Sequence, residues 1–193
     1  MLDTRDTAQP TSLRAIRARQ REEFGGVNWG AAFFGWLVAI GLGALLVGLL
    51  AAMGAAVGLT DLNPEDTTGT ATGPVGIGGA VALLAALAAA YYCGGYVAGR
   101  MSRFDGARQG LGAWLIGLLV TLLLAVAGAL LGAEYNVLEG LNLPALPVGD
   151  AELVSGGAFA LALVVLGTLL AAMIGGKGGE HYHRKVDRAG FPE

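Results

Sequence analysis

Four long stretches of the sequence carry no Lys, Arg, Asp or Glu, and they limit the possible folds more than any other feature. They cover residues 27–60, 71–99, 109–133 and 153–176. Each is longer than the ~20 apolar residues that cross about 30 Å of hydrocarbon. Only 14% of all residues are charged, against about 25% in soluble domains. The sequence therefore predicts an all-α membrane protein with four transmembrane helices, at about residues 29–58, 75–98, 110–132 and 153–176.

The positively charged residues all fall on one side of this arrangement. Lys and Arg occur before the first span, between the second and third, and after the fourth, whereas loops 61–70 and 134–152 carry only acids. Because basic flanks stay in the cytoplasm, we predict a multi-pass protein of the bacterial inner membrane with both termini cytoplasmic. Residues 1–26 are then a cytoplasmic segment with a basic amphipathic helix, 27–176 the membrane domain and 177–193 a basic tail. The basic regions would face an anionic inner leaflet.

Small residues recur at a spacing of four along each predicted span. Lipid tails are as apolar as leucine, so helices in a membrane associate through close packing of small residues. We therefore expect a tightly packed bundle rich in Gly and Ala. In the third span this row of small residues, called the strip below, continues through Thr121, Ala125 and Ala129. The glycines assigned to helix packing are Gly35, Gly43, Gly117, Gly167 and Gly175.

The two halves of the chain share short sequence matches. GAAFFGWLV from Gly30 matches GAWLIGLLV from Gly112 at Gly, Ala, Gly, Leu and Val, and GGAVAL from Gly78 differs from GGAFAL from Gly156 at one position. Two tandem helical hairpins related by an axis along the membrane normal would produce this pattern. Such matches also arise by chance in a chain dominated by Gly, Ala and Leu, so both explanations stay open.

The segment CGGYVAGRMSRFDGARQG, from Cys93 to Gly110, joins the second and third spans. It lacks the Gly-Lys-Ser/Thr sequence of a phosphate-binding loop, so we predict a structural turn and not a ligand site. Asp105 is expected to cap the following helix, and the arginines suit a helix C-terminus near lipid phosphates. The residues assigned to this loop are Gly94, Gly95, Gly99, Arg100, Arg103, Asp105 and Gly106.

A longer pattern runs through the same loop. A span ends in GG-x-x-A-GR, and a turn with further glycines leads into the next span. The residues concerned are Gly94, Gly95, Ala98, Gly99 and Arg100, then Gly106 and Gly110. This pattern resembles that of the YrzE-like family of small bacterial membrane proteins, mainly over residues 75–125. The resemblance implies a multi-spanning membrane fold and no chemistry, because the family has no established activity.

The spans hold no ionisable side chain within the hydrocarbon region, whereas ion-coupled carriers normally keep one there. The two histidines lie together in the tail, too few for a metal site or a catalytic triad. We therefore expect no enzyme, no cofactor, no metal and no nucleic-acid partner. The prediction is an accessory or interaction subunit that associates with itself or with another membrane protein.

Two alternatives stay open. One is a small oligomeric channel or carrier for a neutral or apolar solute. The other is an enzyme that acts on lipid at the membrane interface, with its polar groups drawn from Tyr91, Tyr92, Arg100 and Asp105.

Overall fold

The computed structural model describes residues 18–20, 22–23, 25–56, 74–135 and 151–189. Its long elements are all helices: α2 (Trp29–Ala56), α3 (Pro74–Met101), α4 (Gly106–Tyr135) and α6 (Ala151–Ala189). Residues 18–20 and 22–23 are also helical. The predicted all-α fold is confirmed. The acidic loop at 61–70, most of the second acidic loop, and positions 1–17 and 190–193 lie outside the described residues.

Each long helix contains a segment long and apolar enough to cross a membrane. These segments are Trp29–Gly54, Gly78–Met101, Gly106–Leu130 and Gly157–Tyr182. The chain therefore has the fold of a multi-pass membrane protein. α6 also continues through most of the predicted tail to Ala189, because no proline interrupts the sequence between Ala151 and Pro192.

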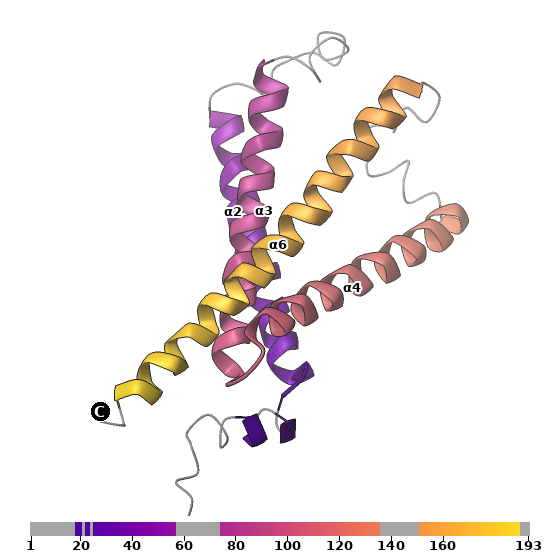
Figure 1. Cartoon of the computed structure of the whole chain (residues 1–193). Coiled ribbons are helices and arrows are strands. Elements are labelled where there is room, and N and C mark those ends of the chain that lie inside the picture. Colours follow the sequence, from indigo (N-terminus) through magenta and orange to yellow (C-terminus); the bar gives the residue numbers. More distant parts are fainter. Residues whose placement is uncertain (1–17, 21, 24, 57–73, 136–150, 190–193) are drawn as a thin grey trace, which may run out of the picture.

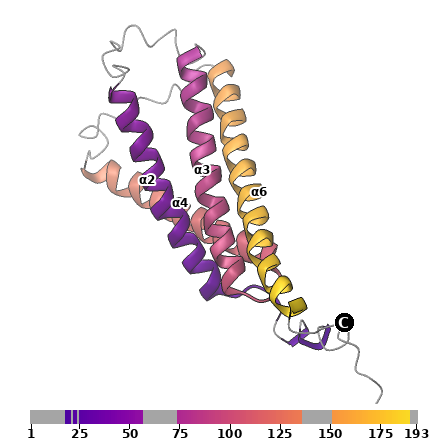
Figure 2. The same cartoon turned by 90° about the vertical axis from the view of Figure 1, so that its left-hand side faces the viewer.

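The helices converge at one end and separate toward the other (Figure 1). The converging end, here the loop end, holds the start of α2, the turn between α3 and α4, and residues 168–182 of α6. α3 lies between α2 and α6 (Figure 2), and those two share no contact among the described residues. α4 leaves the loop end at a wide angle to α2 and α3 (Figure 1).

Side-chain burial is concentrated toward the loop end and involves small residues. The buried hydrophobic side chains of the described residues all belong to alanine: Ala31, Ala32, Ala39, Ala86, Ala90, Ala98, Ala113 and Ala172. Helices held by such residues approach each other backbone to backbone, as expected where lipid surrounds the bundle.

Two small residues of α6, Ala172 and Gly176, pack against two helices at once. A Cβ atom added to any of four facing glycines would overlap the backbone carbonyl of Ala172 or Gly176. α6 therefore fits between α3 and α4 only because no side chain stands at these positions. The facing glycines are Gly95 and Gly99 of α3, and Gly106 and Gly110 of α4.

The glycines predicted for helix packing have unequal surroundings. A Cβ added at Gly35 would lie 2.6 Å from the carbonyl oxygen of Gly94, and one at Gly175 would overlap the carbonyl of Tyr92. Gly117 faces the Tyr91 hydroxyl and the Trp36 ring. Two positions are roomier: the nearest atoms would be the Ala90 methyl at 3.7 Å for Gly43 and Leu84 Cδ1 at 3.3 Å for Gly167.

The outer half of α4 is exposed on every side. Residues 121–130 are all exposed, including the predicted strip members Thr121, Ala125 and Ala129. The strip of this span packs within the chain at Ala113 and Gly117 but not beyond, because α4 has by then diverged from its neighbours (Figure 1).

Candidate functional site

The turn between α3 and α4, residues 102–105, contains the most unusual backbone of the described chain outside glycine. Asp105 has a φ of 56°, a left-handed value that Asp and Asn adopt more readily than other side chains. Ser102 steadies the turn, since its Oγ donates a hydrogen bond to the Phe104 carbonyl at 3.0 Å. The chain thus reverses between two membrane helices within a few residues.

Two acidic residues, Asp105 and Glu180, lie at the start of α4, and the side-chain cap predicted for Asp105 stays a prediction; the Asp105 carbonyl accepts from Arg108 N–H at 2.8 Å and from Gln109 N–H at 3.1 Å. The first amide of α4, Gly106 N–H, donates to Glu180 Oε2 of α6 at 3.0 Å. Asp105 Oδ2 accepts from Gly26 N–H at 3.2 Å and from Arg108 Nη1 at 3.4 Å. Asp105 thus combines a left-handed φ with a carboxylate that contacts the segment before α2, whereas a capping residue normally has extended backbone angles.

Gln109 lies one turn further along α4 and is fully buried, with 0% of its surface exposed. Its Nε2 donates to the Gly26 carbonyl at 2.7 Å, and its Oε1 accepts from Asn28 N–H at 3.0 Å. The amide of Gln109 thereby forms hydrogen bonds with two backbone groups, the Gly26 carbonyl and the Asn28 N–H, that lie outside any helical hydrogen-bond pattern. Together with Asp105 it fixes residues 26–28 on the start of α4.

Asn28 completes this arrangement by starting α2. Its Oδ1 accepts a hydrogen bond from Ala31 N–H at 3.1 Å, the usual geometry of a helix N-cap. Gly26 has a φ of 109°, which only glycine adopts at little cost. Gly26, Asn28, Asp105 and Gln109 are referred to below as the juxtamembrane clamp.

The arginines of the loop have aromatic neighbours. The guanidinium carbon of Arg100 lies 3.7 Å from the ring centroid of Tyr182, and that of Arg103 lies 6.0 Å from the ring of Phe104. A cation at the first distance contributes roughly 0.5–2 kcal/mol. The Arg100–Tyr182 contact joins the end of α3 to α6, so Arg100 is part of the loop-end packing.

Of the polar groups named for a lipid-acting enzyme, Tyr92 and Arg100 contact neighbouring turns of α6, whereas Tyr91 and Asp105 contact other parts of the bundle. The Tyr91 hydroxyl lies against Gly117, the Tyr92 hydroxyl near Gly178, Arg100 on Tyr182, and Asp105 on Gly26. The described residues also contain no group of three His, Cys, Asp or Glu side chains that could hold a metal ion.

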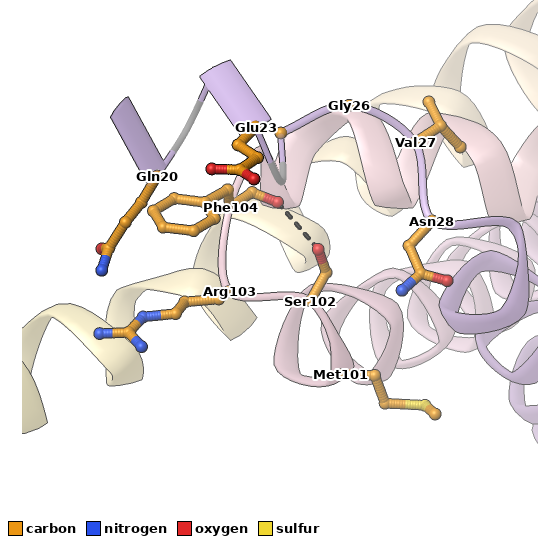
Figure 3. A pocket seen from close by; sticks show the side chains of 10 residues that line it. Gln20, Glu23, Gly26, Val27, Asn28, Met101, Ser102, Arg103 and Phe104 are labelled. Carbon is orange, nitrogen blue, oxygen red and sulfur yellow. Dashed lines mark hydrogen bonds between the residues drawn. The ribbon is translucent and has the colours of Figure 1, made fainter. Parts of the chain in front are cut away.

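A hollow of about 620 Å³ opens beside the juxtamembrane clamp (Figure 3). Its described walls come from residues 20, 23 and 25–28, and from residues 101–104 at the end of α3 and in the turn that follows. Glu23 and Arg103 contribute charge, Asn28 and Ser102 are neutral and polar, and Val27, Met101 and Phe104 are apolar. A second hollow, of about 440 Å³, is an apolar groove between the outer parts of α2 and α3, lined by Leu50, Met53 and Leu83 among others.

These features define a polytopic all-α protein with four helices of membrane-spanning length, in which the turn between α3 and α4 is hydrogen-bonded to the start of α2. Comparison with models of known protein families finds no match, and neither do searches of curated proteins and of solved structures.

Sequence reasoning did not identify three polar residues of this site: Asn28, Gln109 and Glu180. Asn28 had a readable signal, because an Asn directly before a long apolar helix is a common N-cap. Glu180 is the one acid between Lys177 and Lys185 in an otherwise basic stretch. Gln109 could be noticed only as a polar side chain one turn into a membrane helix.

Proposed function

We propose that this chain is an accessory subunit of a bacterial inner membrane that associates with a second copy of itself through the outer half of α4. The observation that supports this most is the exposure of every residue from 121 to 130, on a helix whose first turns are closely packed. Thr121, Ala125 and Ala129 lie on one face there, and small residues at this spacing let a second helix approach closely.

In the same proposal both termini and the loop end face the cytoplasm. Of the described basic residues, Arg100, Arg103, Arg108 and Lys177 belong to the loop end and Arg19 to the segment that leads into it, while Arg184, Lys185 and Arg188 follow in the last turns of α6. Basic residues that flank membrane helices stay on the cytoplasmic side and attract anionic lipid. Membership of the YrzE-like family, based on the loop pattern from Gly94 to Gly110, would agree with this location.

The carrier alternative has one observation in its favour. The indole N–H of Trp36 is buried with no hydrogen-bond partner among the described residues, and the Tyr91 hydroxyl lies against the same glycine, Gly117. Polar groups inside a membrane bundle can mark a solute path. The close backbone contacts at the loop end favour the accessory subunit instead, because they leave the helices little freedom to move apart.

Disulfide cross-linking in native membranes tests the self-association. Cys93 is the only cysteine, so a Cys93→Ala background is free of thiols. Ala125→Cys in this background should form a cross-linked dimer on mild oxidation. Ala127→Cys is the matched control, since it is also an exposed alanine of α4 but lies on the opposite face. Equal cross-linking at both positions, or at neither, would contradict the proposed interface.

A further inference from the structure

The hollow beside the juxtamembrane clamp lies at the level where two membrane helices end. α2 begins at Trp29 and α3 ends at Met101. The hollow is lined by residues just before α2, by the last residue of α3 and by the turn after α3. Val27 and Met101 are 38% and 52% exposed, so its border with the membrane is apolar. Its volume of about 620 Å³ falls within the roughly 300–1,000 Å³ of small-molecule sites.

The charged groups of the hollow have opposite signs and come from different segments. Figure 3 shows Glu23 on the segment before α2 and Arg103 on the turn after α3. Asn28 uses its Oδ1 to cap α2, so its amide nitrogen is the part of that side chain that can donate to a ligand. The described lining therefore contains one carboxylate, one guanidinium and two neutral side-chain amides, those of Asn28 and Gln20.

A ligand that matches this lining carries a cation, an anion and an apolar part. Arginine binds phosphate oxygens through parallel hydrogen bonds, and a primary ammonium can donate to a carboxylate. In an ethanolamine phospholipid the ammonium and the phosphate are separated by two carbons, and the acyl chains continue from the phosphate toward the membrane. A purely anionic lipid could also bind Arg103, but it would set a second negative charge near Glu23 without a cation for that carboxylate.

We propose that the hollow binds a phosphoethanolamine group, carried by a phospholipid of the adjoining leaflet. Glu23 binds the ammonium and Arg103 the phosphate, while Val27 and Met101 border the first part of the acyl chains. This site does not depend on the self-association proposed above, because it lies at the other end of α4. It gives the loop end a preference among lipids that a positive flank alone would not have.

Lipid titration of the full-length protein in detergent micelles, read by native mass spectrometry, tests this assignment. The probes are dioleoyl phosphatidylethanolamine, dioleoyl phosphatidylglycerol and water-soluble glycerophosphoethanolamine. We expect the ethanolamine lipid to bind about tenfold or more tightly than the glycerol lipid. Glu23→Gln should reduce this preference to about twofold or less, and Arg103→Gln should weaken both lipids about tenfold.

The matched controls are Glu22→Gln and Arg19→Gln. Both residues are exposed and belong to the same segment as Glu23, but neither lines the hollow, so both variants should keep the wild-type preference. Glu23 and Arg103 are exposed as well, so their variants should elute as wild type in gel filtration. If glycerophosphoethanolamine binds as tightly as the lipid, the hollow recognises the phosphoethanolamine group itself, and its ligand can be a soluble molecule. Equal affinity of the wild type for both lipids, or a Glu23→Gln variant that behaves like Glu22→Gln, would overturn the proposal.

Discussion

At the scale of single residues, the juxtamembrane clamp depends on side chains that serve backbone groups outside any helix. Gln109 pairs with the Gly26 carbonyl and the Asn28 amide at once and is fully buried. Each buried backbone group that loses its partner costs about 1–3 kcal/mol. A substitution at Gln109 therefore affects two hydrogen bonds at once.

Gln109→Leu should therefore lower the stability of the protein in detergent by about 1–3 kcal/mol, because two part-buried backbone groups lose their partners. Thermal unfolding followed by tryptophan fluorescence measures this effect. Arg108→Ala is the neighbouring control: the Arg108 side chain is 64% exposed and its ion pair with Asp105 spans 3.4 Å, so the loss should not exceed about 1 kcal/mol. Equal melting temperatures for the two variants would show that the clamp carries no stability.

Asp105 allows a test of its backbone conformation. Asp105→Asn should be nearly silent, because Asn also tolerates the left-handed region and its Oδ1 can accept from Gly26 N–H. Asp105→Ser should cost about 1–2 kcal/mol, since serine disfavours this φ and its hydroxyl is shorter. At an ordinary helix cap Ser and Asn would be equivalent. Equal stability of the two variants in thermal unfolding would therefore favour the capping role that the sequence predicts for Asp105.

At the scale of helices, the contact of α6 with α3 is set by glycines that cannot accept even a methyl group. Gly95→Ala would place a Cβ against the Ala172 carbonyl, and the helix backbones would have to separate at a cost of about 1–3 kcal/mol. Gly79→Ala, in the same helix, meets no atom within 4 Å and should be neutral or slightly stabilising. Thermal unfolding of both variants in one detergent gives the comparison. If they melt alike, the glycines reflect composition and not packing.

The helices themselves could be predicted from the sequence, but the place where they pack could not. Charge-free length is sufficient to predict a long apolar helix, and α2 runs from Trp29 to Ala56. Small residues, however, occur along the whole of each helix. Gly95 is enclosed while Gly79 is open, and nothing local distinguishes them. The difference arises from the crossing angles, which depend on all the contacts of the bundle together.

The same limit applies to the clamp. A cap such as Asn28 depends on its own neighbours and can be read from a short window. Gln109 and Gly26 are separated by 83 residues, and Gly106 and Glu180 by 74. Only the folded arrangement of α4 against α6 and against the start of α2 brings these groups together, so no pattern in the sequence identifies the pairs.

At the scale of the whole molecule, packing and exposure are divided between the two ends. The loop end has close helix contacts, the juxtamembrane clamp and the polar hollow, whereas the outer half of α4 is exposed and apolar. This division suits a protein that is anchored at one membrane surface and meets its partner deeper in the bilayer. The orientation of the protein then decides which leaflet adjoins the hollow.

Reporter fusions test that orientation. Fusions after Asp66 and Glu139 should read as periplasmic and those after Arg103 and Arg188 as cytoplasmic, because all twelve Lys and Arg residues lie on one side of the four spans and such asymmetry sets topology. Paired alkaline phosphatase and green fluorescent protein fusions provide the measurement, since each is active on one side only. A cytoplasmic signal from either acidic loop would reverse the arrangement. The loop end, with Glu23 and Arg103 at its hollow, would then face the outer leaflet, and the lipid titration would have to be interpreted with the lipids of that leaflet.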